Sequence, residues 1–593
     1  MPLLALSRVT IAKSVFKIYA ILPPITAPRV EGGVNSQLSV VNSPTLVMTM
    51  SNYTTISHLK SEFRSLGDSI PAMLSRNSDE LPEKISILTL NCWGLKFLSK
   101  YRRERLLEIG KRIAGSNNPP HIVGLQECWT QEDYNNIRRE TQEILPYGKF
   151  YYSGIFGGGL AILSKWPIEE STMFAYPLNG RPTAFFRGDW FVGKGVACAR
   201  IRIGPASTDI ADVFCTHLHA PYEREPHDSY ICHRTAQAWE IVKLMRAAAE
   251  KGHLVIGLGD FNMLPQSLAH RLITSHAPVK DVWSHLHPDS SIGAAIDAAE
   301  MARKKPIPSA DFNVLENGAT CDGIFNTWRW NKTQQNRLKR EGNIVVDGEL
   351  PDPLAKRLDY IYVGDGAFGQ FSSPKKWTIS SARVGMMERH PTLHCSLSDH
   401  FSVEATIVLD TSKDSDAEDE QNSFLPIQKH IESIRSLRSI SPMGSTTLVT
   451  AANATSPTNT EIASQQQQIA LAEDMYDQVL QMISTYAARE RFQRRARLGH
   501  FAASLVVSTS CFVGVWWSPR AFVSFILCLV SSLSLVAGTI DGLIGGLFVS
   551  SELRSLKEFE WEIRNARRTV LGLGLDIEEE HRSPRSAPRG WHR

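Results

Sequence analysis

Between about residues 85 and 410, short apolar runs alternate with longer stretches whose apolar residues recur at helical spacing. Short runs that are apolar throughout predict strands buried on both faces. The predicted strands span residues 85–91, 121–126, 159–164, 195–203, 210–217, 253–259, 358–363 and 401–409. The amphipathic stretches at 102–114, 130–145 and 230–251 predict helices between them. This alternation predicts a layered α/β domain over residues 85–410.

The segments on either side of this domain lack its pattern. Residues 1–84 are predicted to be a flexible leader, and the absence of acidic residues before Glu31 is typical of a targeting segment. A leader without any targeting role explains the same composition. Residues 411–470 are first acidic and then rich in Ser, Thr, Asn and Gln, which predicts a disordered linker.

Two long apolar runs follow near the C-terminus. Residues 501–518 and 521–540 carry no charged side chain, and only Pro519 and Arg520 separate them. Each run is close to the length that crosses a bilayer as a helix, so we expect a transmembrane hairpin over 501–550. A buried helical pair in a soluble domain is the alternative, and the absence of polar faces argues against it.

Basic segments flank the hairpin, a predicted amphipathic helix at 471–500 and a tail at 551–593. Residues 489–497 alone hold five arginines and one glutamate. The positive-inside rule then places both termini and the α/β domain in the cytosol. We expect the membrane to be that of the endoplasmic reticulum, with the mitochondrial outer membrane as the alternative. The basic clusters either attract activating anionic phospholipids or serve only to set this orientation.

Composition adds two limits. With 593 residues, of which 42% are apolar, the chain can bury a large core, and its net charge of +3 indicates no particular partner. The nine cysteines form no CxxC pair, which favours reduced thiols in a cytosol-facing protein over a disulfide framework.

Polar residues capable of catalysis follow several of the predicted strands. They are Asn91 in ILTLNCWG, Glu127 in IVGLQECW, His217 and His219 in VFCTHLHA, Asp260 and Asn262 in LVIGLGDFN, and Asp399 and His400 in LSDHFSV. Groups that end buried strands gather at one edge of a sheet, where α/β enzymes build their sites. Oxygen ligands and histidines without a cysteine cluster suit Mg²⁺ and phosphate chemistry better than zinc.

The metal and phosphate contacts can be assigned from residue type. Glu127 is the best candidate for a direct Mg²⁺ ligand, with Asn91 beside it as a ligand or substrate contact. His217 and His219 lie two residues apart, so we expect both to face the same side and one or both to contact phosphate. The Asn262 amide can bind a phosphoryl oxygen.

The remaining groups suit proton transfer. His400 is the natural general base because imidazole titrates near neutral pH. A base of this kind needs an orienting carboxylate, and Asp359 in RLDYIYV is the candidate. Asp399 is the alternative partner and a further candidate metal ligand. Asp260 can orient or deprotonate a water molecule.

The order N…QE…H…GDxN…LDY…SDH resembles the endonuclease/exonuclease/phosphatase superfamily over residues 85–410. This resemblance implies a four-layer α/β sandwich with two central sheets and Mg²⁺-dependent phosphodiesterase activity, with Mn²⁺ as a substitute metal. It implies a metal-binding role for Glu127, phosphate contact for His217, and acid–base catalysis by Asp359 and His400. For Asn91 and Asn262 it implies metal-shell or phosphate contacts, and for Asp260 the handling of water or the leaving group.

The motifs NCWG, QECW and THLHAPY are similar to those of neutral sphingomyelinases and fungal inositol phosphosphingolipid phospholipases C. RGDWFVGKG at 187–195 matches a P-loop-like segment of that group, whose acid and base fall on Asp189 and Lys194. In the group this pair is implied to switch the site between inactive and active arrangements. By its residues alone the segment shows only a glycine-containing loop with one acid and one base, and nucleotide binding is not expected because Gly195 follows Lys194.

The sequence therefore predicts a membrane-anchored, Mg²⁺-dependent phospholipase C that releases ceramide from inositol phosphosphingolipids. A neutral sphingomyelinase that releases phosphocholine is the nearest alternative. A membrane-tethered nuclease is more distant because the motifs are not accompanied by a dense Lys/Arg stripe, so we expect no nucleic-acid partner. A non-catalytic scaffold would lack a catalytic group, and every expected group is present.

Overall fold

A computed structural model describes residues 80–223, 227–366, 376–410, 459–571 and 573, with side chains of the last long segment described from residue 470 onward. The chain divides into the units 1–77 and 78–593, and only the second falls within the described residues. Nearly all of the predicted leader lies outside them, as do residues 411–458 of the predicted linker and 574–593 of the tail.

Two six-stranded sheets form the centre of the α/β domain. The first has the order β11-β12-β1-β2-β4-β3 and the second β5-β6-β7-β8-β10-β9. The first sheet contains β1 (Lys84–Asn91), β2 (Ile122–Gln126), β3 (Tyr147–Tyr151), β4 (Leu160–Ser164), β11 (Lys376–Gly385) and β12 (Ser402–Asp410). The second contains β5 (Ile168–Ala175), β6 (Gly195–Arg202), β7 (Ile210–His217), β8 (Leu254–Asp260), β9 (Lys280–Asp281) and β10 (Asp359–Asp365).

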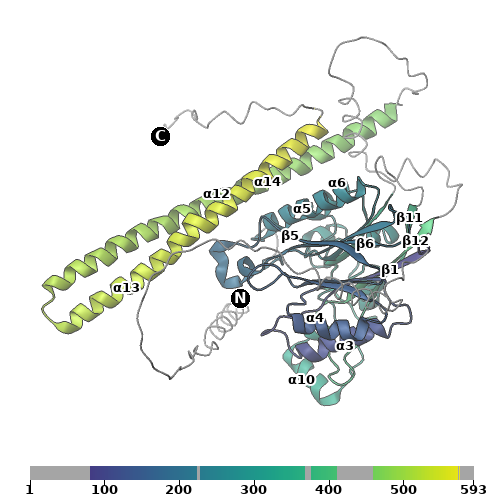
Figure 1. Ribbon diagram of the computed structural model, residues 1–593, viewed down its shortest axis with the longest axis horizontal. Helices are drawn as coiled ribbons and strands as arrows, with labels where there is room; N and C mark the ends of the chain where they lie inside the picture. The colour runs from purple at the N-terminus through teal and green to yellow at the C-terminus, as the bar shows by residue number, and fades with distance from the viewer. Residues whose placement is uncertain (1–79, 224–226, 367–375, 411–458, 572, 574–593) are drawn as a thin grey trace, which may run out of the picture. The chain divides into compact units, whose positions relative to one another are not determined.

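Helices cover the outer face of each sheet. The first sheet packs against α3 (Arg102–Ala114) and α4 (Gln131–Thr141), and the second against α5 (Ile231–Ala249) and α6 (Leu268–His276). Figure 1 shows the resulting order of layers, with the sheets between the two helical pairs. The predicted four-layer α/β sandwich is confirmed.

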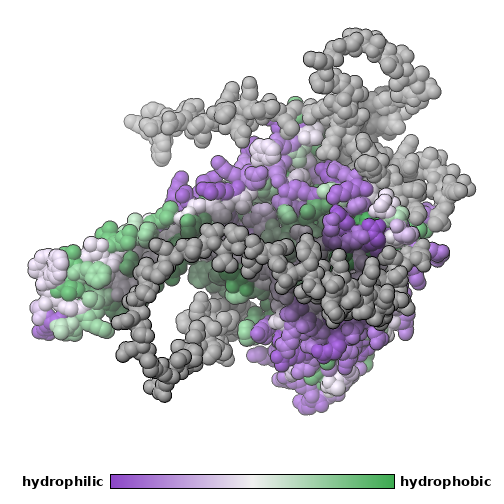
Figure 2. Space-filling model, in the orientation of Figure 1, coloured by the Kyte–Doolittle hydropathy of each residue, from purple (hydrophilic) through white to green (hydrophobic). Residues whose placement is uncertain are grey.

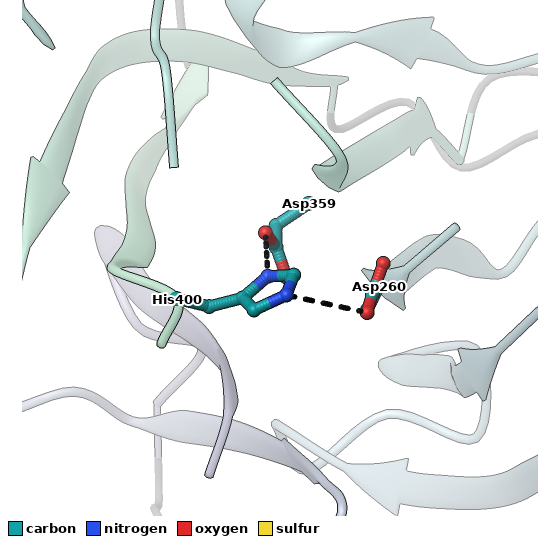
Figure 3. Close-up of side chains that lie close together, drawn as sticks. All are labelled: Asp260, Asp359 and His400. Atoms are coloured by element: carbon teal, nitrogen blue, oxygen red, sulfur yellow. Dashed lines mark hydrogen bonds and ion pairs between the residues drawn. The ribbon is translucent and has the colours of Figure 1, made fainter. Parts of the chain in front are cut away.

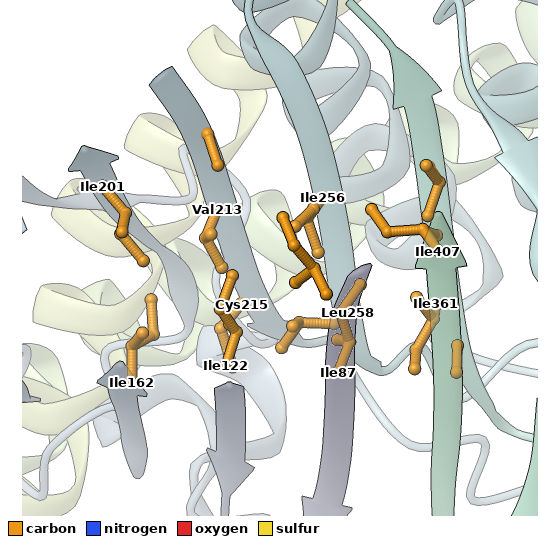
Figure 4. Close-up of a cluster of buried hydrophobic side chains, with 14 of the residues drawn as sticks. Ile87, Ile122, Ile162, Ile201, Val213, Cys215, Ile256, Leu258, Ile361 and Ile407 are labelled. Carbon is orange, nitrogen blue, oxygen red and sulfur yellow. The ribbon is translucent and has the colours of Figure 1, made fainter. Parts of the chain in front are cut away.

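The inner faces of the two sheets meet in a core of aliphatic side chains. Ile87 and Ile122 from the first sheet face Val213, Ile256 and Leu258 from the second, all of them fully buried (Figure 4). The sheets approach so closely at Gly124 that a Cβ there would lie 1.8 Å from Cδ1 of Leu258. These all-apolar strands form because each is covered on both sides.

A long connection between β9 and β10 carries short helices. They are α7 (Val282–Leu286), α8 (Ala298–Ala302), α9 (Ala310–Leu315) and α10 (Lys332–Glu341). The capping box of α10, in which Asn331 and Gln334 bond each other's backbone N–H groups, fixes where that helix begins.

The C-terminal region is more helical than the sequence predicted. Helix α12 (Asn459–Gly514) begins within the predicted linker and continues through the first apolar run. Helix α13 (Ala521–Leu543) passes through a π-helical turn at Ile544–Phe548 into α14 (Val549–Val570), so the first part of the predicted tail is helical. The linker was predicted from composition alone, and no secondary structure was predicted for the tail. Helices in proteins are stabilised mainly by packing against other elements, which composition does not indicate.

Two segments, Ala470–Trp517 and Ala521–Val570, are long and apolar enough to cross a membrane, judged by length and composition. Ser508 Oγ lies 2.7 Å from Ser531 Oγ, and a Cβ on Gly538 would lie 2.3 Å from Cβ of Ser504. Small residues at such contacts let helices approach closely. Figure 2 shows hydrophobic colour along α12 and α13 near the turn that joins them, whereas much of the visible α/β domain is hydrophilic.

The other ends of these helices pack on the α/β domain. Side chains of α12 and α14 form one buried apolar cluster with Cys232, Ala236 and Trp239 of α5 and Leu272 of α6. The Trp239 indole N–H donates to Glu562 at 2.6 Å, and Lys243 Nζ lies 2.8 Å from the same carboxylate. The helical region is therefore docked on the domain that carries the catalytic motifs.

Candidate active site

Strand direction brings the predicted site residues to one edge of the two sheets. β1 runs parallel to β2, and β7 runs parallel to β8 with His217 opposite Asp260. β10 is antiparallel to β8 and begins where β8 ends, with Asp359 opposite Asp260. β12 is antiparallel to β1, so His400, two residues before it, arrives at the same edge.

Asn91 joins the ends of the two sheets. Its Nδ2 donates to Oδ2 of Asp260 at 3.0 Å and lies 3.3 Å from Oε1 of Glu127, while its Oδ1 accepts from the Trp93 backbone N–H at 3.0 Å. One amide thus fixes a carboxylate from each sheet. The contact explains why an amide, which has both donors and an acceptor, stands at the end of β1.

The backbone is strained at the same place. Trp93, Glu127 and Asn262 adopt φ angles of 48°, 54° and 47°, in the left-handed region that non-glycine residues rarely occupy. Each such residue costs about 1 kcal/mol or more, and strain of this kind concentrates at functional sites. Here Glu127 is the first residue after β2 and Asn262 the second after β8, so the chain leaves both strand directions at these residues.

His400 and Asp359 form a buried pair (Figure 3). His400 Nδ1 lies 2.8 Å from Asp359 Oδ2, and the Thr320 hydroxyl donates to the same oxygen at 2.5 Å. Nε2 on the other side of the ring faces Asp260 Oδ2 at 3.9 Å. Burial alone would lower the pKa of His400, but neighbouring Cys321, Asp359 and Asp260 together raise it well above its usual value.

Asp260 is central to the cluster and almost fully buried. Its carboxylate accepts from the Asn262 backbone N–H at 2.9 Å, and His217 Nε2 lies 3.5 Å from it. Burial is the largest of the influences that raise the pKa of Asp260, to about 6. Burial and the nearby Lys194 lower the pKa of His217 well below its usual value, so its imidazole is neutral, and its Nδ1 has no hydrogen-bond partner among the residues that the structure describes.

Glu127 and Asp399 form the part of the site that suits a divalent cation. Burial, and next the charge of Asp399, raise the pKa of Glu127 to about 7. Lys194 and His400 oppose this rise without cancelling it. Its Oε2 is buried and has no hydrogen-bond partner within the described parts of the chain. Two neighbouring carboxylates, one of them with an oxygen open to a ligand, match the oxygen ligands that Mg²⁺ prefers. The donor set is therefore chemically suited to the metal that the sequence predicted.

A second group of potential ligands has another use. Asp260, Asp359 and His400 offer ligand atoms within 4.8 Å of one another. However, Asp359 Oδ2 and His400 Nδ1 are already engaged with each other. We therefore interpret this group as a proton-transfer arrangement, with the metal position on the side of Glu127.

Three further predicted site residues, Lys194, Asp189 and His219, lie near this cluster without belonging to it. Lys194 Nζ donates to the backbone oxygen of Leu218 at 2.9 Å, and Asp189 Oδ1 lies 3.6 Å from His219 Nδ1. Burial lowers the pKa of Lys194, whereas Asp189, Glu127 and Asp260 oppose that change. Lys194 is thus close enough to sense the catalytic carboxylates, although its ammonium group bonds to backbone.

His219 is placed differently from the expectation. β7 ends at His217, so the alternation of a strand does not extend to His219. The fully buried ring lies 5.0 Å from the ring of Tyr230 and 5.7 Å from that of His233, and burial lowers its pKa to about 3. The carboxylate next to its Nδ1 is that of Asp189, at 3.6 Å.

Two contributors could not be found from the sequence. Thr320 comes from the long connection between β9 and β10, where no apolar run or motif marks it. The Leu218 backbone oxygen accepts from both Lys194 Nζ and Asn262 Nδ2, at 2.9 and 3.2 Å. A backbone group has no residue type that could indicate it.

A buried arginine on α3 holds the loops around the site. Arg105 is fully buried and donates to the backbone oxygens of Cys92, Trp93 and Leu397 at 3.1, 2.8 and 2.6 Å. Its guanidinium also lies 4.7 Å from the Trp93 ring. It thereby ties the segment after Asn91 to the segment before His400.

Replacing Arg105 with methionine is expected to lower the free energy of unfolding by about 3 kcal/mol, because buried carbonyls lose their donors. Urea unfolding followed by circular dichroism measures this change. Arg103→Met on the same helix is the matched control, since Arg103 is exposed and pairs with Glu132, which is also exposed. Equal stability of the two variants would contradict the role assigned to Arg105.

Comparison with known proteins agrees with this geometry. A model of the Endonuclease/Exonuclease/phosphatase family matches residues 88–400. The chain is 34% identical over 488 residues to the inositol phosphosphingolipids phospholipase C of Schizosaccharomyces pombe, which covers 82% of this chain and 95% of that protein. It is 32% identical over 534 residues to the protein of the same name from Saccharomyces cerevisiae, covering 86% and 94%. With human sphingomyelin phosphodiesterase 2 it shares 35% identity over 204 residues, 34% of this chain and 45% of that protein.

Proposed function

Because this chain belongs to the endonuclease/exonuclease/phosphatase family, and within it to the phosphodiester hydrolases that comprise inositol phosphosphingolipid phospholipases C and neutral sphingomyelinases, we propose that it hydrolyses inositol phosphosphingolipids to ceramide and a phosphorylated headgroup. The observation that carries the proposal is the buried His400–Asp359 pair facing Asp260, with Glu127 and Asn91 beside it. The inositol headgroup is favoured because the two yeast relatives match over 94% or more of their length, against 45% for the human sphingomyelin phosphodiesterase.

In the proposed step, His400 takes a proton from water at Nε2. The water oxygen forms a bond to phosphorus as the bond from phosphorus to the ceramide oxygen breaks, and solvent supplies the proton that the ceramide oxygen then needs. Asp359 keeps the imidazole oriented through Nδ1 and stabilises the imidazolium, as the carboxylate does in other paired bases. Asp260, 3.9 Å from Nε2, orients the water.

The other side chains of the site bind the phosphodiester. His217, whose Nδ1 has no hydrogen-bond partner among the described residues, is suited to contact a phosphoryl oxygen. Asn262 Nδ2 donates to Asp260 Oδ2 and to the Leu218 backbone oxygen, each at 3.2 Å, so it would exchange one of these contacts to donate to a phosphoryl oxygen. Glu127, with Asn91 and Asp399 beside it, would hold Mg²⁺. When bound, that ion supplies positive charge against the phosphoryl oxygens and the departing oxygen.

We further propose that the C-terminal helices anchor the protein in the endoplasmic reticulum membrane with its α/β domain in the cytosol. Their apolar segments and the basic residues on both flanks support this orientation. The same basic residues would attract anionic phospholipids, each charge contributing about 1 kcal/mol near such a surface. An anchor of this kind keeps the site where a water-insoluble substrate is found.

A substrate comparison tests the function. The purified full chain in Mg²⁺ is given inositol phosphoceramide, sphingomyelin and abasic DNA in parallel, and each product is quantified with and without chelator. We expect the highest kcat/KM on inositol phosphoceramide, lower activity on sphingomyelin, and none on DNA. A higher kcat/KM on sphingomyelin than on inositol phosphoceramide would show that phosphocholine, and not inositol phosphate, is the preferred headgroup. Cleavage of DNA alone would refute the lipid substrate.

A further inference from the structure

Six large apolar side chains are exposed on three loops of the α/β domain. Phe97 and Leu98 are 76% and 57% exposed, Ile155 and Phe156 are 73% and 59%, and Phe185 and Phe186 are 47% and 53%. We call these six residues the apolar rim. Exposed apolar residues that occur in adjacent pairs on neighbouring loops indicate an interaction surface more strongly than scattered single ones.

All three loops leave the sheets at the edge that holds the active site. Residues 92–101 follow β1 directly after Asn91, and residues 152–159 precede β4, whose first residues pair with the end of β2. Residues 176–194 precede β6, which begins opposite the end of β7. The second and third loops also contact each other, because the backbone N–H groups of Ile155 and Phe156 donate to the Phe191 oxygen at 3.2 Å.

The opposite edge of the sheets differs. Its described connections are residues 115–121, 142–146, 165–167, 203–209, 250–253 and 277–279. None of these connections has an exposed large apolar side chain, and their apolar residues Leu145, Trp166 and Ile203 are buried. The apolar rim therefore has no counterpart among the described connections of the opposite edge. The long connection between β9 and β10 also exposes apolar side chains, such as Phe312 and Leu315, so it supplies a comparison surface within the same domain.

Contacts with the C-terminal helices indicate what covers the rim. The Trp190 ring lies 4.5 Å from that of Phe548, at the end of the π-helical turn, and Arg497 donates to the Thr183 backbone oxygen at 3.3 Å. Arg497 also pairs with Asp541, which follows the second apolar run and marks its polar end. The loop that bears Phe185 and Phe186 is thus held at the boundary between the polar and apolar parts of the helices.

The composition around the rim suits a bilayer surface better than a protein partner. Exposed Lys96 and Lys100 flank Phe97 and Leu98, and Lys96 Nζ lies 5.6 Å from the Phe97 ring. Aromatic side chains beside lysines are typical of segments that enter the headgroup region of anionic membranes.

We propose that the apolar rim inserts into the lipid bilayer around the active site, so that the substrate's headgroup reaches Glu127 and His400 while its acyl chains stay in the membrane. This inference rests on the proposed function, because it assumes a lipid substrate and a membrane-anchored chain. It adds a second membrane contact, made by the catalytic domain itself.

The test uses the double variant F185S/F186S of the full chain in proteoliposomes. Hydrolysis of bilayer inositol phosphoceramide is compared with that of a short-acyl, water-soluble analogue below its micelle concentration. We expect about a tenfold loss on the bilayer substrate, the effect of withdrawing apolar side chains from the membrane, and no change on the soluble analogue. F312S/L315S is the matched control. These two apolar residues of α9 are similarly exposed, at 51% and 65%, but they lie outside the apolar rim on a helix that contacts β11.

A fluorescent probe measures insertion without relying on activity. F186C and F312C are each labelled with an environment-sensitive dye in a chain that carries C511S and C528S. Reconstitution into liposomes with anionic lipid should shift the emission of the probe at 186, but not at 312, to shorter wavelength. Equal emission at both positions, or equal losses on the two substrates in F185S/F186S, would overturn the inference. Wild-type chain inactive on both substrates, with the shift at 186 intact, would refute the proposed function but leave insertion standing.

Discussion

Replacing His400 with alanine is expected to reduce kcat/KM on inositol phosphoceramide by about 10³-fold, the range typical for loss of a positioned general base. His400 holds the one imidazole among the described residues that faces both Asp359, at 2.8 Å, and Asp260, at 3.9 Å. The other site histidine, His217, has a pKa far below its usual value and is a weaker base. Initial rates on proteoliposomes measure the loss.

The matched control for His400→Ala is His287→Ala, because His287 pairs with an exposed glutamate outside the site. It should retain wild-type rates. Full activity of His400→Ala, or an equal loss in His287→Ala, would contradict the assignment.

The pH profile provides an independent signature of the same residue. His400 must be neutral to accept a proton, and Cys321, Asp359 and Asp260 raise its pKa against the effect of burial. The free enzyme's kcat/KM should therefore fall as the pH is lowered through that raised pKa. In His400→Ala the residual activity should lack this decline at low pH. An unchanged decline in that variant would show that a different group titrates.

The second large effect concerns Glu127 and Mg²⁺. Without a cation, burial and Asp399 raise the pKa of Glu127 from 4.5 to about 7. The folded state then binds more protons than the unfolded state between these values, so this group makes the metal-free protein more stable as the pH falls through 7. Mg²⁺ requires the ionised carboxylate, so its stabilisation should grow as the pH rises.

Thermal unfolding with and without Mg²⁺ at pH 6 and pH 8 measures this linkage. Mg²⁺ at a hundredfold excess over its Kd stabilises a protein by about 2.7 kcal/mol. We expect the rise in Tm to be larger at pH 8 and absent in Glu127→Gln, which should also lose activity by about 10³-fold. Glu132→Gln, an exposed carboxylate on α4, should behave as wild type. A Mg²⁺-dependent rise in Tm that persists in Glu127→Gln would place the metal elsewhere.

The strands that the sequence predicted and missed divide by their place in the sheets. The eight predicted runs correspond to the inner strands, whereas β3, β5, β9 and β11 were missed and are the four sheet edges. Most inner strands are buried along their length because the other sheet covers one face and helices cover the other, whereas β6 and β12 are buried mainly on the face toward the other sheet. β5, with the sequence IEESTMFA, is exposed or half-buried along its length. It forms through hydrogen bonds to β6, which its own sequence does not indicate.

The residues of the site likewise fall into those that the sequence could identify and those that it could not. Asn91, Glu127, Asp260 and His400 could be identified because each ends or precedes an apolar run, and topology then brought them together. Thr320 and the Leu218 carbonyl could not, since their roles depend on long-range packing and on backbone geometry. His219 was misplaced because the strand ends two residues before it.

The unbroken course of α12 has a consequence for kinetics. The helix runs for 56 residues, roughly 84 Å, with its first part packed on α5 and its later part against α13. With the apolar helices in the membrane as proposed, a rigid arm of this kind would keep the catalytic edge at a constant height above the lipid, and the anchor would prevent the enzyme from leaving the surface between turnovers. Its rate would then follow the mole fraction of substrate within the bilayer. Adding inert lipid to the membrane would slow it, whereas diluting the vesicles with buffer would not.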